Sequence, residues 1–400
     1  MNTAKKFTLI LILVIAVAVL GLLLFVRLSG AEEPPVTAVP AASETPAPEE
    51  TAEPTPSPTA EPTPSPTPEP EPEYFTVSMV GDCTLSSSQL YPHFEYIIDG
   101  DMSWPFSGTV QYFEDDYLTI ANLECSLSEE KLTGHTTFWF CGAAENAQIL
   151  VDGSVEFVTL GNNHTMDFGQ TGLDNTKATL DSYGIAYGEP NGSYVYRRDD
   201  GVTIGLYSAK WLATQSEIVS GVSALAQRDD IDIVICLMHW GNEGSYRLTE
   251  NQRLLGQAAI DAGADIVYGS HPHVLQQIDE YNGGYIVNSL GNWVFGGNTA
   301  PRDRDTAIVQ FTIKRDVDGT VTVEGWEAIP CRLSSTAAYN DYRPEPYEEG
   351  TEEYERAMSK LLGSYTGPDL VVDYSQYHEK DEAAETPAVE APTTTETTTE

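Results

Sequence analysis

The chain has 400 residues, with 61 aspartates and glutamates against 20 lysines and arginines, which gives a formal net charge of −41 at pH 7. A chain this acidic repels the phosphate backbone of nucleic acids, so we exclude nucleic acid as a partner. The five cysteines show no Cys-x-x-Cys spacing, which argues against a zinc knuckle. We expect them to be small buried residues, and a disulfide from Cys125 to Cys141 or to Cys83 is the alternative.

The first residues predict a membrane anchor. Residues 7–26 are twenty uncharged, mostly apolar residues, and at about 1.5 Å per residue a helix of this length spans the roughly 30 Å core of a bilayer. Lys5 and Lys6 precede this run, which favours a cytoplasmic N-terminus. Residues 1–30 are therefore expected to be a cytoplasmic stub and a signal-anchor helix, with a cleavable signal peptide as the alternative. The anchor predicts a single-pass protein of the cell membrane whose folded domain is extracellular.

Composition separates the regions that follow. Residues 31–73 hold 14 of the 25 prolines, which predicts a stiff, extended linker. Residues 74–334 are expected to form the folded domain, and residues 335–378 an extension packed on it. Residues 379–400 are acidic and Thr-rich, which is typical of a disordered tail.

Strand and helix patterns alternate along the folded domain. The expected strands are 75–80, 117–123, 154–160, 231–238, 265–269 and 284–295, the expected helices are 144–152, 171–184 and 249–264, and hairpins are expected at 194–209 and around Asp318-Gly319. Continuous Val, Ile and Leu runs between helices indicate strands buried on both faces of a sheet, whereas the hairpins add antiparallel strands. The fold class is therefore α/β with mixed sheets.

Five of the expected strands are followed by polar side chains that could bind metal or move protons. These residues are Asp82, Glu124, Asn162, Asn163, His164, His239, Glu243, His271 and His273. The carboxyl ends of strands in an α/β sheet meet at one edge, where ligands bind, so we expect these side chains to converge. Mixed nitrogen and oxygen ligands suit Mn, Zn or Fe better than Mg or Ca. The pattern predicts one or two divalent transition metal ions.

The segments "GDCTL", "NLECSL", "GNNHTMDFGQTGL", "HWGNE", "GSHPHVLQ" and "NSLGNWVF" together resemble the CapA family, which is associated with capsule and poly-γ-glutamate synthesis. That family is similar to the calcineurin-like metallophosphatases. The resemblance implies a four-layer α/β/β/α sandwich. It covers residues 75–295 of this chain.

The resemblance also implies a role for each matching residue. Asp82 and His273 would bind the first metal, and Glu124 would bridge it to the second. Asn163, His239 and His271 would complete the second site. One departure is that Thr84 stands where the metallophosphatase pattern has a histidine, so the first metal loses a ligand.

Catalysis and substrate binding are expected beside these ligands. The resemblance implies that His164 hydrogen-bonds the substrate or protonates the leaving oxygen, and Asp167 is expected either to orient His164 or to be a turn or N-cap residue. Asn162, Arg302 and Arg304 are expected to bind substrate, with local ion pairs as the alternative for the two arginines.

The resemblance implies a function in capsule or poly-γ-glutamate synthesis or export. The first hypothesis is a metal-dependent hydrolase that acts on a polymer or a phosphorylated intermediate. The alternative is a non-catalytic component that binds or exports the polymer. The candidate partners are an extracellular anionic polymer or its precursor, the membrane, and membrane proteins of capsule synthesis.

Overall fold

The computed structural model describes residues 70–88, 93–134, 138–199 and 201–372. The predicted anchor at residues 7–26, nearly all of the predicted linker and the predicted tail at 379–400 lie outside the described residues. Within the described ranges, no helix is both long and apolar enough to cross a membrane.

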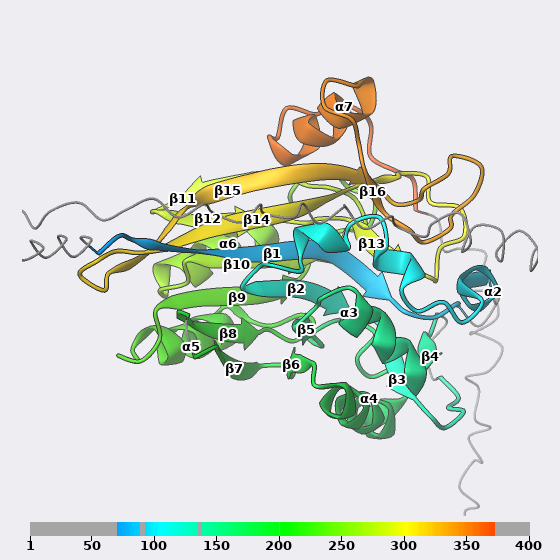
Figure 1. The fold of residues 1–400 in the computed structure, drawn as a ribbon, viewed down its shortest axis with the longest axis horizontal. Coiled ribbons are helices and arrows are strands. Elements are labelled where there is room, and N and C mark those ends of the chain that lie inside the picture. Colours follow the sequence, from blue (N-terminus) through cyan, green and yellow to red (C-terminus); the bar gives the residue numbers. More distant parts are fainter. Residues whose placement is uncertain (1–69, 89–92, 135–137, 200, 373–400) are drawn as a thin grey trace, which may run out of the picture. The chain divides into compact units, whose positions relative to one another are not determined.

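The first sheet contains most of the strands that carry predicted site residues. Its order is β16-β15-β14-β1-β2-β5-β6, and β13 pairs with β1 (Figure 1). The bounds are β1 (Glu73–Thr84), β2 (Leu118–Leu123), β5 (Phe157–Thr159), β6 (Ala186–Gly188), β13 (Asn292–Phe295), β14 (Asp305–Arg315), β15 (Val321–Arg332) and β16 (Glu345–Pro346). β1, β2, β5 and β6 are parallel, whereas β14 is antiparallel to β1, so the sheet is mixed as predicted.

The second sheet has the order β11-β12-β10-β9-β8-β7. The bounds are β7 (Gly192–Arg197), β8 (Thr203–Ser208), β9 (Ile233–His239), β10 (Ile266–Ser270), β11 (Ile278–Tyr281) and β12 (Gly284–Val287). β8, β9, β10 and β12 are parallel, and the predicted hairpin at 194–209 is the antiparallel pair of β7 and β8. A small third sheet pairs β3 (Ser126–Ser128) with β4 (Cys141–Ala143).

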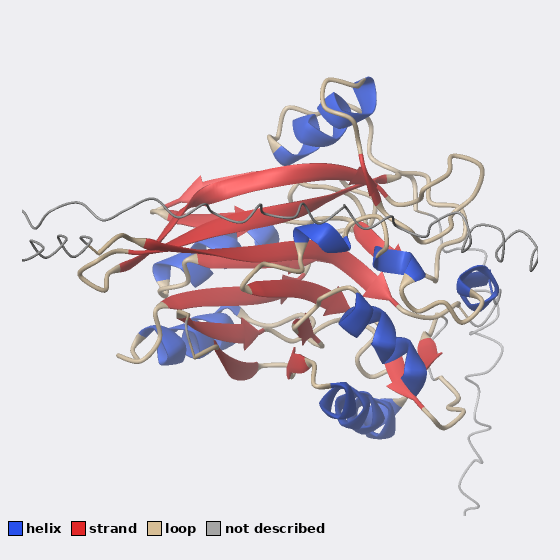
Figure 2. Ribbon diagram, viewed as in Figure 1, coloured by secondary structure: helices blue, strands red, loops and turns tan. Residues whose placement is uncertain are grey.

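Helices cover the outer face of each large sheet (Figure 2). α5 (Gln215–Ala226) and α6 (Glu250–Asp261) pack on the second sheet, and α3 (Gln148–Asp152) and α4 (Gly169–Tyr183) pack on the first. Shorter elements join the helical layer of the first sheet, namely α2 (His93–Ile98) and the 3₁₀ turns η1 (Trp104–Phe106), η2 (Val110–Tyr112) and η3 (Ala144–Ala147).

Apolar residues of the two sheets meet in one buried cluster between them. In β2, Leu118 and Ile120 face this cluster, while Ala121 and Leu123 face the helices on the other side. Successive side chains of a strand point to opposite faces, so both faces of β2 are buried. The layers are therefore helix, sheet, sheet and helix, which is the predicted four-layer arrangement. α7 (Glu352–Leu361) lies against β14 and β15 (Figure 1).

The prediction of one strand over residues 284–295 is wrong. The chain leaves the second sheet after β12 and enters the first sheet as β13. Gly291 has φ 69°, a left-handed conformation that glycine adopts without strain, and its carbonyl accepts a hydrogen bond from the Asp82 backbone at 2.8 Å. This turn joins the two sheets next to Asp82, to which it is hydrogen-bonded.

Three helices, α2, α5 and α7, were not predicted. α5 begins with a complete capping box between Thr214 and Glu217, a signal that is present in the sequence. The predicted helix at 144–152 is a 3₁₀ turn followed by one short α-helix. The five cysteines are free thiols, four of them buried, which confirms the prediction of small buried residues over a disulfide.

Candidate metal centre

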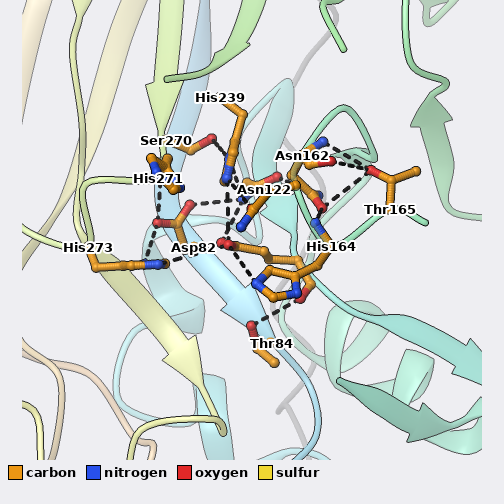
Figure 3. Close-up of polar contacts among 12 residues, drawn as sticks. Asp82, Thr84, Asn122, Asn162, His164, Thr165, His239, Ser270, His271 and His273 are labelled. Atoms are coloured by element: carbon orange, nitrogen blue, oxygen red, sulfur yellow. Dashed lines mark hydrogen bonds and ion pairs between the residues drawn. The ribbon is translucent and has the colours of Figure 1, made fainter. Parts of the chain in front are cut away.

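The strand-end residues of both sheets converge on one place (Figure 3). Asp82 lies near the end of β1, and Glu124 directly follows β2. His239 is the last residue of β9, and His271 follows β10. The convergence predicted from the sequence is therefore present, and it draws on both sheets.

Two groups of possible ligand atoms share one carboxylate. Asp82, Glu124 and His273 form the first group, and Glu124, His239 and His271 form the second, with the ligand atoms of each group within 4.8 Å of one another. Asn163 joins the second group, because its Oδ1 lies 2.8 Å from His239 Nε2. The grouping matches the one that the family resemblance implied for two ions, and Glu124 is common to both groups.

The Glu124 carboxylate fits a shared cation. Its Oε1 is buried and has no hydrogen-bond partner among the described residues, although buried polar atoms are nearly always paired. The Nε2 atoms of His239, His164 and His273 lie 3.6, 3.9 and 3.9 Å from it. Two ligands about 2.1 Å from one tetrahedral ion are about 3.4 Å apart. The spacing therefore leaves room for ions between this oxygen and the imidazoles.

Burial and neighbouring charges set the protonation of this centre. Burial and the Asp82 carboxylate raise the pKa of Glu124 well above its usual value. Burial lowers the pKa of His239 well below its usual value and that of His271 to about 3. Burial opposes charge on His273 too, but the Glu124 and Asp82 carboxylates raise its pKa to about 10. His239 and His271 are thus neutral imidazoles, the form that binds metal.

Ser270 fixes the tautomer of His239. The Ser270 hydroxyl donates to the Met238 carbonyl at 3.1 Å, so its oxygen accepts the hydrogen on His239 Nδ1 at 2.8 Å. The lone pair of neutral His239 is then on Nε2. Because Asn163 Oδ1 and Glu124 Oε1 are also acceptors, this tautomer fits a cation bound among the three atoms. Hydrogen bonds of this kind commonly orient histidines that bind metal.

Asn122 holds both carboxylates and was not predicted as a site residue. Its Nδ2 lies 2.9 Å from Asp82 Oδ1 and 3.3 Å from Glu124 Oε2. Its Oδ1 accepts a hydrogen bond from Asn162 Nδ2 at 3.1 Å. The sequence contained a signal for this role. Asn122 precedes Glu124 by two positions, and alternate residues along an extended segment share a face.

The two histidines of "SHPH" have unusual backbones. His271 has φ 98° and His273 has φ 55°, and such conformations cost on the order of 1–3 kcal/mol each for residues other than glycine. Two hydrogen bonds hold this turn: the His271 backbone donates to Asp82 Oδ2 at 3.3 Å, and the Pro272 carbonyl accepts from the Gly244 backbone at 2.8 Å. The strained turn aims His271 and His273 at different groups of ligands.

His164 and Asp167 form a pair at the edge of the centre. His164 Nδ1 lies 2.8 Å from Asp167 Oδ2, and Asp167 is buried. The same Asp167 oxygen accepts a hydrogen bond from the Phe140 backbone at 3.3 Å, and the Phe140 ring lies 4.7 Å from the imidazole. Asp167 is not the N-cap of α4, which is Phe168. The structure therefore supports the predicted orientation of His164 by Asp167.

A cavity of about 620 Å³ opens beside this centre. Its lining includes Asn163, His164, Asp167, Glu243, His273, Phe140, Phe295 and Arg302, together with Leu370 and Val372 from the C-terminal segment. One wall thus carries candidate ligands and the His164–Asp167 pair. The Phe140 and Phe295 rings lie against His164 and His273, so apolar surface borders the polar wall.

The three residues predicted to bind substrate differ in position. Arg302 lines the cavity, and its guanidinium donates to the Val371 carbonyl. Asn162 is buried behind the centre, and Arg304 donates to the Thr336 carbonyl at 3.0 Å. In the part of the chain that the structure describes, these two do not line the cavity. A direct contact of Asn162 or Arg304 with substrate stays a prediction, and their observed hydrogen bonds are structural.

Thr84 and Glu243 also lie beside the candidate ligands. Thr84 Oγ1 donates to the Glu124 carbonyl at 3.3 Å, so the residue that stands in the histidine position supports the backbone of Glu124. Glu243 was noted at a strand end but given no role. The structure places its carboxylate in a group with His271 and His273, again within 4.8 Å.

The protein is an α/β/β/α sandwich with histidines and carboxylates at its strand ends. It therefore belongs to the class of proteins with a candidate two-ion centre at the edge of such a sandwich. A model of the family described as "Bacterial capsule synthesis protein PGA_cap" matches residues 76–189 and 187–297, more than half of the chain. The chain belongs to this family.

Curated relatives agree with this assignment. The chain is 35% identical over 201 residues to the PGA biosynthesis protein CapA of Bacillus subtilis, covering 45% of this chain and 52% of that protein. It is 31% identical over 194 residues to the capsule biosynthesis protein CapA of Bacillus anthracis, covering 42% and 47%. A probable polyglutamine synthesis accessory protein of Mycobacterium tuberculosis is 24% identical over 273 residues, covering 58% and 71%. The chain spans about half the length of the two Bacillus proteins.

Solved structures are more distant. A Haemophilus influenzae NAD nucleotidase has a TM-score of 0.38 at 12% identity, covering 78% of this chain and 60% of that one. A purple acid phosphatase from yellow lupin has a TM-score of 0.30 at 13% identity, covering 64% and 53%.

Proposed function

We propose that this protein is a metal-dependent hydrolase that acts in capsule or poly-γ-glutamate synthesis or export. The observation that carries the proposal is the buried Glu124 Oε1, which has no hydrogen-bond partner among the described residues and faces three imidazole nitrogens at 3.6–3.9 Å. The substrate class follows from the family, and we propose the polymer itself or a phosphorylated intermediate.

Two divalent ions, Mn or Zn and alternatively Fe, would be held by the two groups of ligands that share Glu124. Bound there, they would supply Lewis-acid polarisation of the substrate and activation of a water at neutral pH. Asn122 holds the carboxylates for this purpose, and Ser270 keeps the His239 lone pair on Nε2.

His164 is placed to move a proton at the substrate. Asp167 accepts the hydrogen on Nδ1, which leaves Nε2 directed toward Glu124 and the cavity. A protonated Nε2 can donate to a leaving oxygen or nitrogen, and such general acid catalysis contributes about 10²–10⁴-fold in rate. Phe140 lies against the imidazole and excludes water from that side.

We also propose where the protein works. Residues 7–26 would anchor it in the cell membrane with the folded domain outside, where the polymer or its precursor would reach the cavity past Arg302. Membrane proteins of capsule synthesis are the partners we propose. The support for this placement is the apolar run and the proline-rich segment in the sequence.

The test is hydrolysis by the purified full-length protein loaded with Mn²⁺ or Zn²⁺, with poly-γ-glutamate and an aryl phosphate as substrates. We expect turnover of at least one substrate, and a loss of 100-fold or more in kcat for His164→Gln with unchanged metal content. His93→Gln is the matched control, because His93 contacts Tyr342 at 2.7 Å instead of the centre. Equal activity of His164→Gln and wild type would contradict the proposal.

A second candidate is a non-catalytic protein that binds or exports the polymer. It is favoured by Thr84, which occupies the position of an expected ligand and bonds to a backbone carbonyl. Replacing Asn163 and His164 together by alanine separates the two functions in cells. The hydrolase predicts loss of normal polymer output, whereas an export component predicts normal output from the folded double variant.

A further inference from the structure

The loop between β9 and α6 reaches the centre from a direction that the two groups of ligands do not use. Gly241 and Gly244 have φ 86° and φ 70°, so the chain turns sharply on both sides of Glu243. The Gly244 backbone donates to the Pro272 carbonyl at 2.8 Å. Because Pro272 separates the two histidines, this bond fixes Glu243 beside both of them.

The other side of the loop is held as well. The Gly244 carbonyl accepts a hydrogen bond from the Leu370 backbone at 2.9 Å, so the C-terminal segment covers the loop. Glu243 is half-buried and lines the cavity. Its carboxylate is thus placed by backbone contacts on both sides and is more than a solvated surface charge.

A second observation points to a cation at the same place. His271 Nδ1 is buried and, within the described ranges, has no hydrogen-bond partner, and the His271 residue is only 6% exposed. The ligand atoms of Glu243, His271 and His273 lie within 4.8 Å of one another. A buried nitrogen without a hydrogen-bond partner is the arrangement that a bound metal ion satisfies, and Glu243 joins this centre through His273, which also belongs to the first group.

The Glu243 carboxylate would add a fourth donor to the first ion. Asp82, Glu124 and His273 offer three donors to the first ion, and four is the usual number for a tetrahedral site. Thr84, which stands near this group, is bonded to the Glu124 carbonyl. His273, one of these three donors, also belongs to the group that contains Glu243. The Glu243 side chain lines the cavity.

We propose that Glu243 is a ligand of the first ion and completes the site where Thr84 provides no donor. The inference rests on the metal centre of the proposed function, but it concerns a residue that the two-group arrangement does not use. Three carboxylates in one centre also need the positive charge of two divalent ions, since like charges this close repel one another.

The experiment counts ions in the full-length protein. Chelator-treated wild type and Glu243→Gln are titrated with Mn²⁺ and with Zn²⁺ by calorimetry, and bound metal is measured by elemental analysis after gel filtration. We expect two ions in wild type. In Glu243→Gln we expect one ion to bind as in wild type and the other at least 10-fold more weakly. Glu250→Gln, an exposed change at the start of the nearby helix α6, should match wild type.

Two further measurements exclude a folding defect. Glu243→Asp keeps the carboxylate and should recover part of the lost affinity, and the metal-free Glu243→Gln protein should unfold at no lower temperature than metal-free wild type. Co²⁺ added to the same proteins should give a weaker visible absorption band in Glu243→Gln, because one site changes its ligand set.

The outcomes separate this inference from the proposed function. Two ions in Glu243→Gln, each with a Kd within twofold of wild type, would overturn the inference and leave the proposed hydrolase standing. No ions in wild type would overturn both. Loss of one ion in Glu243→Gln from a protein that hydrolyses nothing would uphold the ligand and reject the hydrolase.

Discussion

Asn122 links more of the candidate centre than any ligand does by itself. Its amide nitrogen donates to Asp82 Oδ1 and Glu124 Oε2 at 2.9 and 3.3 Å, and its oxygen accepts from Asn162 Nδ2 at 3.1 Å. Because it is fully buried, removal of the side chain leaves buried carboxylate oxygens without this partner. The residue acts by positioning the ligands and touches no substrate.

We expect Asn122→Ala to weaken metal binding by about 10–100-fold, the usual effect of removing a partner that orients metal ligands. Competition with a chelating dye measures this directly. Asn175→Ala is the control. Asn175 lies on α4, and its side chain donates to Ser128 Oγ at 2.9 Å, away from the centre. Unchanged affinity in Asn122→Ala would show that the carboxylates hold their positions without it.

The residues of the centre were predictable to the extent that they follow apolar runs. Asp82, Glu124, His239 and His271 each stand where a strand ends, and chain direction brings such ends together. Asn122 was missed because it lies inside a strand and reads as part of it. Glu243 was noticed without a role, because only the turn at Pro272 reveals which side chains its loop approaches.

At the scale of elements, the C-terminal extension contributes directly to the cavity. Asp369 accepts hydrogen bonds from the Tyr246 backbone at 2.8 Å and from Arg247 Nη1 at 2.6 Å. These bonds bring Leu370 and Val372 into the cavity lining. The extension is also tied to β14 through the buried Lys360 of α7.

Lys360 Nζ lies 2.7 Å from both Asp303 Oδ2 and Asp305 Oδ2. Asp303 itself lines the cavity. Removing one partner of a buried ion pair is strongly destabilising, since the other charge is left unpaired. The contacts of the extension therefore include the two buried ion pairs of Lys360 on α7 and the exposed pair at Asp369, besides the hydrogen bonds of Leu370 and Val371.

We expect Asp369→Ala to release residues 364–372 while α7 stays in place. Amide hydrogen exchange of residues 244–247 should become at least 10-fold faster, because the Tyr246 amide loses its acceptor. Asp230→Ala, which removes an exposed ion pair with Arg228 at a distant surface, should leave that exchange unchanged. Equal exchange in Asp369→Ala and wild type would mean that the other contacts of the segment, including the Leu370–Gly244 and Arg302–Val371 hydrogen bonds, hold it without Asp369.

The sequence predicted elements best where an apolar run is bounded by turn residues. Strands β1, β2, β9 and β10 were found in this way. The run at 284–295 was predicted as one strand because both halves are apolar. In the structure the chain crosses from one sheet to the other near Gly291, so the two halves are separate strands. α7 was missed because its charged sequence resembles exposed coil, yet Ala357 and Leu361 are fully buried.

At the scale of the whole molecule, stability should depend on pH through two carboxyls, Asp116 and Glu156, that belong to none of the groups of candidate metal ligands. Burial raises the pKa of Glu156 to about 7 and that of Asp116 to about 6. Glu156 accepts a hydrogen bond from the Thr119 backbone nitrogen, and Asp116 accepts one from the Thr119 hydroxyl. Their protonated forms are therefore favoured by folding.

A group whose pKa is higher in the folded than in the unfolded state stabilises the fold below its unfolded pKa, and this contribution is lost as the pH rises through the folded value. We expect the free energy of unfolding of the chelator-treated protein to fall between about pH 4.5 and pH 7. Glu156→Gln should have a flatter profile there, measured by urea unfolding. Identical slopes in both proteins would contradict the assignment.

The two sheets each bring part of the centre, so the site exists only when the sandwich is assembled. Tyr268 of the second sheet donates to the Val80 carbonyl of the first at 2.7 Å, and the His271 backbone donates to Asp82. Metal bound across this junction should stabilise the native state, since the unfolded chain holds no such site.

The measurement to make first is elemental analysis of the purified full-length protein, before and after exposure to Mn²⁺ and Zn²⁺. Two ligand groups that share Glu124 predict two transition metal ions per chain. One ion would mean that the group containing Asp82 and His273 does not bind metal, even with Glu243 beside it. No metal after either ion is offered would contradict the metal centre and leave polymer binding or export as the function.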